Sequence, residues 1–157
     1  SEGTIYHYRV KAENSIGTTY GSDMTFTTLG QVPTASSLSA IEVTANGSKL
    51  KGIVSANYLS TIISFEYGLT TSYGSTITSD PNMVTGNSPT NISADITGLS
   101  GGTTYHYRVV ATNSLGTTNS NDITFTTLGQ LPLTTALPAT GVSTTEATLR
   151  GTVNANY

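Results

Sequence analysis

The sequence predicts an all-β protein made of tandem β-sandwich domains, and three observations lead to that prediction. The stretch GTIYHYRVKAENSIGTT, which begins at Gly3, returns almost unchanged as GTTYHYRVVATNSLGTT from Gly102. Many short segments alternate apolar and polar residues, which is the period of a strand with one buried face. No segment shows helical periodicity over the roughly 10 to 12 residues that a helix requires.

A single gapless offset of 99 residues aligns residues 1–58 with residues 100–157. Such a period is too long for a small solenoid unit and matches a whole small domain of about 100 residues. We therefore divide the chain into the C-terminal part of one repeat (1–33), a complete repeat (34–131) and the N-terminal part of the next repeat (132–157).

The two partial repeats each supply two strands, and a lone hairpin is marginally stable in water. Neighbouring repeats or identical subunits are therefore expected to cover them. A longer tandem array is favoured over strand sharing between subunits. Joining the two partial repeats would still omit three of the seven expected strands and leave exposed edges, which proteins generally avoid.

Seven short strands are expected in the complete repeat, separated by turn residues such as Asn-Gly. The alternation places Leu50 and Val54 on one face of the second strand, and Tyr105 and Tyr107 on the inner face of the sixth. Residues 79–89 are expected to form a loop, because they are rich in Pro, Asn, Asp and Gly. The expected strands are 40–45, 49–56, 61–68, 72–79, 91–99, 105–111 and 120–128.

The stretch LSGGTTYHYRVVATNSLG, residues 99–116, resembles the fibronectin type III signature: a Leu, a Gly-Thr turn, a Tyr, alternating apolar residues, an Ala, an Asn and a Gly. The resemblance implies seven-stranded fibronectin type III-like sandwiches and makes Tyr105 the structural tyrosine-corner residue, with Tyr6 as its copy. The tyrosine hydroxyl would hydrogen-bond a nearby backbone group. The repeat also resembles the tandem fibronectin-like repeats of large bacterial surface proteins, although the Trp usual in the second strand is absent.

The composition excludes several classes of function. Charged residues are 10% of the chain and the net charge is −3, so strong binding to nucleic acid or to an anionic membrane is not expected. No apolar run approaches the roughly 20 residues that insert into a bilayer. There is no Cys, and 31 Thr and 19 Ser supply most of the polar surface. Thr favours strands, and here it alternates with apolar residues.

No group of residues suggests catalysis, a cofactor or a metal. His7 and His106 are copies of one outward residue with no catalytic partner nearby in sequence, and a catalytic His needs a positioned carboxylate or nucleophile. Glu66 is an isolated carboxylate. Asp80 and Asp95 lack the ligand spacing of a calcium loop. The chain is therefore not expected to be an enzyme.

Two acceptor sequons for N-glycosylation occur, NGS at Asn46 and NIS at Asn91. On their own they are weak motifs. Together with a surface poor in charge and rich in hydroxyls, they suggest covalent glycans and an extracellular or cell-surface location.

These observations lead to the expectation of a structural tandem-repeat protein that forms an extracellular fibre, filament or stalk. The alternative is an adhesin or a polysaccharide-binding accessory region of a larger secreted protein. Exposed aromatic residues would favour the alternative, and Tyr20, Tyr58 and Tyr73 are the candidates for that role.

Overall fold

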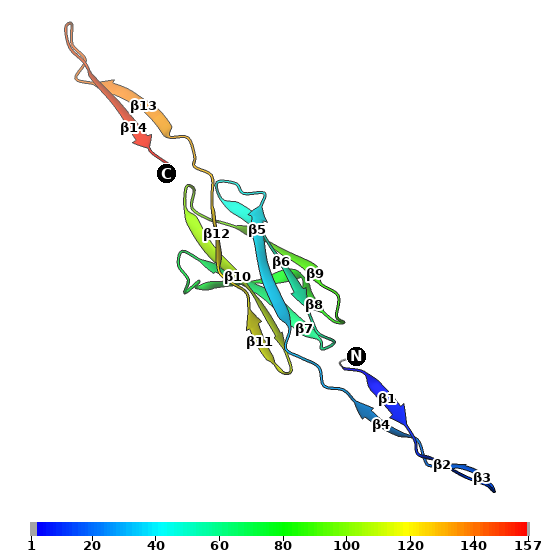
Figure 1. Ribbon diagram of the computed structural model, residues 1–157. Coiled ribbons are helices and arrows are strands. Elements are labelled where there is room, and N and C mark those ends of the chain that lie inside the picture. Colours follow the sequence, from blue (N-terminus) through cyan, green and yellow to red (C-terminus); the bar gives the residue numbers. More distant parts are fainter. Residues whose placement is uncertain (1–2, 157) are drawn as a thin grey trace.

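The computed structural model describes residues 3–156, and all regular structure in this part of the chain is β. Figure 1 shows a central unit with one hairpin arm at each end, so that the molecule is elongated. The central unit has eight strands where seven were expected: β11 is additional, because it ends before the expected last strand 120–128, and β12 covers the middle of that strand. Its strands are β5 (Thr34–Ile41), β6 (Gly47–Ser55), β7 (Thr61–Gly68), β8 (Ser75–Val84), β9 (Thr90–Thr97), β10 (Thr104–Asn113), β11 (Gly116–Asn119) and β12 (Ile123–Thr126).

The strands of the central unit pair antiparallel in the order β11-β10-β7-β8-β9-β6-β5, and β12 also pairs with β10. Strand β8 pairs with β7 over most of its length but pairs with β9 at one position only, where Asp80 lies opposite Ser93. The chain therefore forms one group around β6 and another around β10, joined through β8.

The core of the central unit lies where the alternation predicted it. Leu50 and Val54 of β6, Phe65 of β7, and Tyr107 and Val109 of β10 are fully buried. The aromatic rings of Phe65 and Tyr107 lie 6.3 Å apart, a distance at which such pairs attract each other. Period-two patterning was thus sufficient to assign the inner faces of the main strands.

Other segments also differ from the prediction: the N-terminal part has four short strands where two were expected, and two segments of the central unit are placed differently. The first strand spans 34–41 and not 40–45, because Glu42 has a positive φ of 52° and turns the chain away from the ladder. The predicted loop 79–89 begins instead as the second half of β8. The Ser79 hydroxyl donates to the Ile63 and Pro81 carbonyls, and Val84 is buried opposite Thr61.

The two arms are exposed. In the N-terminal arm β1 pairs with β4 and β2 with β3, and in the C-terminal arm β13 pairs with β14. Each arm points its hairpin tip away from the central unit (Figure 1). The boundaries of the three parts, 33/34 and 131/132, stay predictions. The arm strands are β1 (Ile5–Tyr8), β2 (Lys11–Asn14), β3 (Gly17–Tyr20), β4 (Met24–Thr27), β13 (Leu133–Thr140) and β14 (Thr148–Asn154).

Candidate functional site: the joint between units

The tyrosine-corner candidate Tyr105 is buried, and its hydroxyl accepts a hydrogen bond from the backbone nitrogen of Ser100 at 3.0 Å. This is a contact of the kind that the resemblance implies. Its copy Tyr6 lies on the exposed face of β1 and stacks on Phe26, with ring centroids 5.4 Å apart. The role of both residues stays a prediction.

His106 does have a carboxylate partner, which the sequence analysis missed. Its Nδ1 lies 2.8 Å from Asp122 Oδ2, and the copy pair His7–Asp23 has a distance of 2.7 Å. The partners are 16 residues apart in each pair and meet only because β10 and β12, like β1 and β4, are adjacent. The pairing therefore follows from the strand pairing and not from proximity in sequence.

The polar residues around His106 form a closed network on the surface of the central unit. The Tyr73 hydroxyl donates to Asp122 at 3.0 Å, and burial is the main cause that raises the pKa of this tyrosine. Arg108 pairs with Glu66 at 2.7 Å and lies over the Tyr73 ring. Asp122 thus binds both His106 and Tyr73, and Glu66 binds Arg108, so these polar groups satisfy one another.

The remaining candidates lie apart from one another. Asn46 and Asn91 are both exposed, and their glycosylation stays a prediction. Lys49 lies between Glu42 and Asp95, and the hydrogen bond to Glu42 is the main cause that raises its pKa. Within residues 3–156 no three His, Cys, Asp or Glu side chains gather as metal ligands would.

Several hydrogen bonds and close contacts form the joint between the N-terminal arm and the central unit. The linker, residues 28–33, is extended at this joint, so its carbonyl groups accept hydrogen bonds from donors outside the linker. Three side chains of the central unit supply them, and we call this set the linker clasp. Its bonds run from Asn113 Nδ2 to Gln31 O at 2.7 Å, from Asn57 Nδ2 to Val32 O at 2.7 Å, and from Thr118 Oγ1 to Pro33 O at 2.6 Å.

Backbone conformation shapes the clasp. Asn57 and Tyr58 have positive φ angles of 50° and 68°, an uncommon conformation outside glycine. This turn follows β6. It directs the side-chain amide of Asn57 toward the linker and places Tyr58 against the N-terminal arm. A Cβ placed on Gly3 would lie 2.8 Å from the Tyr58 Cβ, so the arm and the central unit are in close contact here.

Glycine also permits the close packing of the linker. A Cβ at Gly30 would lie 2.6 Å from the Cγ of Leu59, and this approach leaves no room for a larger residue without movement. Leu59 and Leu115 line an apolar cavity with Leu29 of the linker. The joint thus combines backbone hydrogen bonds with a small apolar contact.

The second joint repeats part of this arrangement. Asn156, the copy of Asn57, has a positive φ of 43° and donates to the carbonyl of Leu131, the copy of Val32, at 3.0 Å. The same clasp residue and the same carbonyl are thus used at both ends of the central unit. The joint is a feature of the repeat and not of one position.

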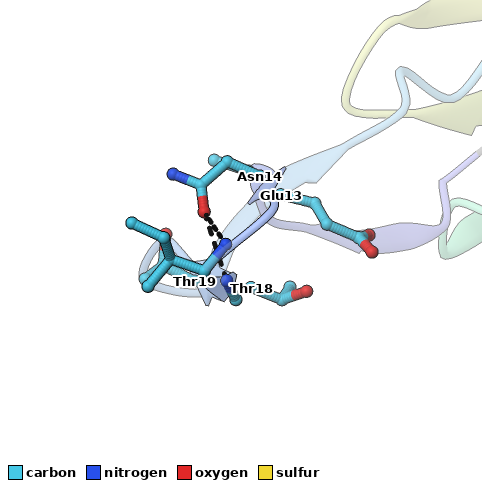
Figure 2. A pocket seen from close by; sticks show the side chains of 7 residues that line it. Glu13, Asn14, Thr18 and Thr19 are labelled. Carbon is cyan, nitrogen blue, oxygen red and sulfur yellow. Dashed lines mark hydrogen bonds between the residues drawn. The ribbon is translucent and has the colours of Figure 1, made fainter.

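The counterpart of the Asn113–Thr118 site lies on the N-terminal arm. There the β2–β3 hairpin forms an open groove, in which Asn14 is the copy of Asn113 and Thr19 the copy of Thr118 (Figure 2). The Asn14 Oδ1 accepts hydrogen bonds from the backbone nitrogens of Ile16 and Gly17, at 2.9 and 3.1 Å. The groove is lined by Ala12, Glu13, Asn14, Ile16, Gly17, Thr18 and Thr19.

Comparison with known proteins gives structural likeness only. No family model matches the chain, and no curated protein matches it. Similar solved structures include a short form of the sensor domain of the anti-sigma factor RsgI4 of Pseudobacteroides cellulosolvens, at 24% identity and a TM-score of 0.48; it covers 62% of this chain and 96% of that one. A long form of that sensor domain has 25% identity and a TM-score of 0.45, and covers 61% of this chain and 89% of that one.

Both structures are sensor domains of an anti-sigma factor, and neither is described as a fibre or an adhesin. This finding overturns the expectation of a structural fibre, filament or stalk. The alternative of an adhesin or polysaccharide-binding region receives no support either. Among the described residues there is also no helix that could cross a bilayer.

Proposed function

We propose that the chain is a non-catalytic sensing or relay module, built from tandem fibronectin-type sandwich units whose joints pass a displacement of one unit to the next. The linker clasp is the observation that carries this proposal. A flexible tether would leave its carbonyls to water, whereas here three successive carbonyls are held by side chains of one unit. The likeness to the RsgI4 sensor domains, at TM-scores below 0.5, adds no support.

The two-layer sandwich itself is part of the proposal. Strands β5, β6 and β9 form one group of paired strands, and β7, β10, β11 and β12 form another. Side chains of both ladders share one core: Leu50 of β6 and Ile92 of β9 are buried together with Tyr107 of β10. Antiparallel ladders with a shared core and short turns are typical of such sandwiches.

The absence of catalysis is proposed from the chemistry of the polar groups. Asp122 already binds His106 and Tyr73, and Glu66 already binds Arg108. Among the described residues, no buried side-chain nitrogen or oxygen lacks a hydrogen-bond partner. An active site needs groups that are left free to meet a substrate, and this network offers none. An extracellular or cell-surface location fits a surface that is poor in charge and rich in hydroxyls.

The clasp is strong enough to hold the joint. A hydrogen bond of this kind contributes about 0.5–1.5 kcal/mol net, so three bonds together contribute a few kcal/mol. The Gly3–Tyr58 and Gly30–Leu59 contacts add apolar packing at the same place. A force or rotation applied to the arm would therefore reach β6 and β10 of the central unit through Asn57 and Asn113.

The test is the relative orientation of the arm and the central unit, measured by residual dipolar couplings. One alignment tensor should fit the amides of β1–β4 and of β5–β12 together. The double variant Asn57→Ala, Asn113→Ala should require two tensors. Asn46→Ala, which removes an exposed amide outside the joint, serves as the control and should leave one tensor. A wild-type chain that needs two independent tensors would refute the relay.

A further inference from the structure

The chain contains one hairpin groove twice, once filled and once open. Strands β10 and β11 pair with Asn113 opposite Gly116, and β2 and β3 pair in the same register with Asn14 opposite Gly17. In the central unit this groove holds the linker. In the N-terminal arm the same residue types face solvent (Figure 2).

The filled copy shows what the groove accepts. The side chain of Val32 lies over the glycine of the turn, because a Cβ at Gly116 would be 3.3 Å from the Val32 Cγ1. Asn113 and Thr118 hold the carbonyls on either side of this valine. The occupant is thus an extended peptide with an apolar residue between two carbonyls that accept hydrogen bonds.

The open copy has the same parts in place. A Cβ at Gly17 would meet no atom within 4 Å, so the space that Val32 fills over Gly116 is empty here. Asn14 Oδ1 caps the turn as Asn113 Oδ1 does through the Leu115 nitrogen at 2.9 Å. This fixes the amide so that its Nδ2 is turned away from the turn, as Figure 2 shows.

We propose that the β2–β3 groove is a binding site for an extended segment of the repeat's own linker sequence, Gly-Gln-Val-Pro or Gly-Gln-Leu-Pro, from another repeat. Asn14 takes the carbonyl of the Gln, Thr19 takes the carbonyl of the Pro, and the Val or Leu side chain covers Gly17. The site does not depend on the relay function, because the groove would bind the segment even at a flexible joint.

The chemistry of the segment explains the choice of occupant. Proline restricts the backbone to an extended form, which lowers the entropy lost on binding, and it has no N–H that would need a partner in the groove. The linkers at residues 30–33 and 129–132 both have this sequence. Asn156 holds the Leu131 carbonyl of the second linker as Asn57 holds the Val32 carbonyl of the first, so the two linkers are recognised in the same way.

The test uses the full chain labelled with ¹⁵N and a synthetic peptide of residues 27–36, TTLGQVPTAS. Two hydrogen bonds and one apolar contact predict weak, millimolar binding. The Asn14 side-chain amide and the backbone amides of Ile16 and Gly17 should shift saturably. The equivalent amides at Asn113 and Leu115 should not move, because their groove is already filled; they are the internal control.

Two variants and one peptide sharpen the result. Asn14→Ala combined with Thr19→Val should abolish the shifts, and so should a peptide in which Val32→Gly removes the apolar contact. The same shifts on concentrating the chain without peptide would support the site and identify residues 129–132 of a second copy as the source. The proposal would be overturned if the β2–β3 amides did not shift at the highest soluble concentration of the peptide. It would also be overturned if the altered peptide caused shifts of equal size.

Discussion

The N-terminal arm and the β10–β12 region of the central unit have nearly the same sequence but opposite surroundings. Tyr107 is fully buried, whereas its copy Tyr8 is 52% exposed. Val109 is fully buried, whereas its copy Val10 is 70% exposed. Strand β10 is continuous over ten residues, while the matching segment of the arm is divided into β1 and β2. The local sequence forms the hairpins in both places, but burial depends on β5, β6 and β7, which only the central unit supplies.

We expect this difference in burial to have its largest effect on stability in the aromatic core. Tyr107→Ala should destabilise the central unit by about 3–5 kcal/mol, because it leaves a cavity beside Phe65 and removes the hydrogen bond to the Leu38 carbonyl. Tyr8→Ala should change the free energy of unfolding by less than about 0.5 kcal/mol. Denaturant unfolding of both variants measures the contrast. A large cost for Tyr8→Ala would mean that the arm is covered in solution, and the comparison would fail.

Alkaline pH should test the burial of Tyr107. Burial raises the pKa of Tyr107 from 10.0 to about 12, so the folded state keeps a proton that the unfolded state loses near pH 10. The stabilisation is complete below pH 10 and is lost as the pH rises from 10 to about 12, by at most roughly 3 kcal/mol. Unfolding curves recorded across this pH range should show the loss, and Tyr107→Phe should flatten it. A wild-type chain equally stable at pH 9 and pH 12 would contradict the burial argument.

Part of the fold and little of the joint could be predicted from the sequence. The sequence places Leu50, Val54 and Tyr107 in the core because strand patterning is local and has a period of two. The clasp could not be found in this way, because Asn113 and Gln31 are 82 residues apart and meet only after folding. A signal did exist: Asn14 and Asn113 recur at the repeat offset, as do Asn57 and Asn156, and these residues have no place in an apolar–polar alternation.

The function expected from the repeat was wrong for a related reason. Tandem units and a hydroxyl-rich surface describe how a chain is built, and many functions share one fold. The partner of His106 is not evident from the sequence, because Asp122 is 16 residues away and lies beside His106 only across the paired strands. Strand pairing, once predicted, would have placed the two residues next to each other.

A glycine pair offers a smaller contrast. A Cβ at Gly52 would lie 2.5 Å from the Val109 side chain and 2.9 Å from the Ser36 carbonyl, whereas at its copy Gly151 the nearest atom is 3.1 Å away. Gly52→Ala should therefore cost about 1–3 kcal/mol through overpacking. Gly151→Ala should cost clearly less, because no side chain of another ladder faces it. Thermal unfolding of the two variants, monitored by circular dichroism, provides the measurement, and equal shifts in Tm would show that the C-terminal arm is packed as tightly as β6.

The smallest expected effect concerns the two His–Asp pairs, which have the same sequence spacing but different support. Asp122 also accepts the Tyr73 hydroxyl, and its side chain is 30% exposed, whereas Asp23 binds His7 alone at 57% exposure. Exposed ion pairs contribute about 0–1 kcal/mol, because solvent screens them and two side chains lose freedom. Asp122→Asn should therefore lower the free energy of unfolding by roughly 0.5–1 kcal/mol, within that range. Asp23→Asn should have no measurable effect.

The free energies of unfolding of both variants are measured by denaturant unfolding at low and at high salt, and the Asp122→Asn effect should shrink as the salt concentration rises. A larger effect for Asp23→Asn would show that the arm's pair is shielded by a neighbour, and the distinction between the open arm and the closed central unit would then have to be redrawn.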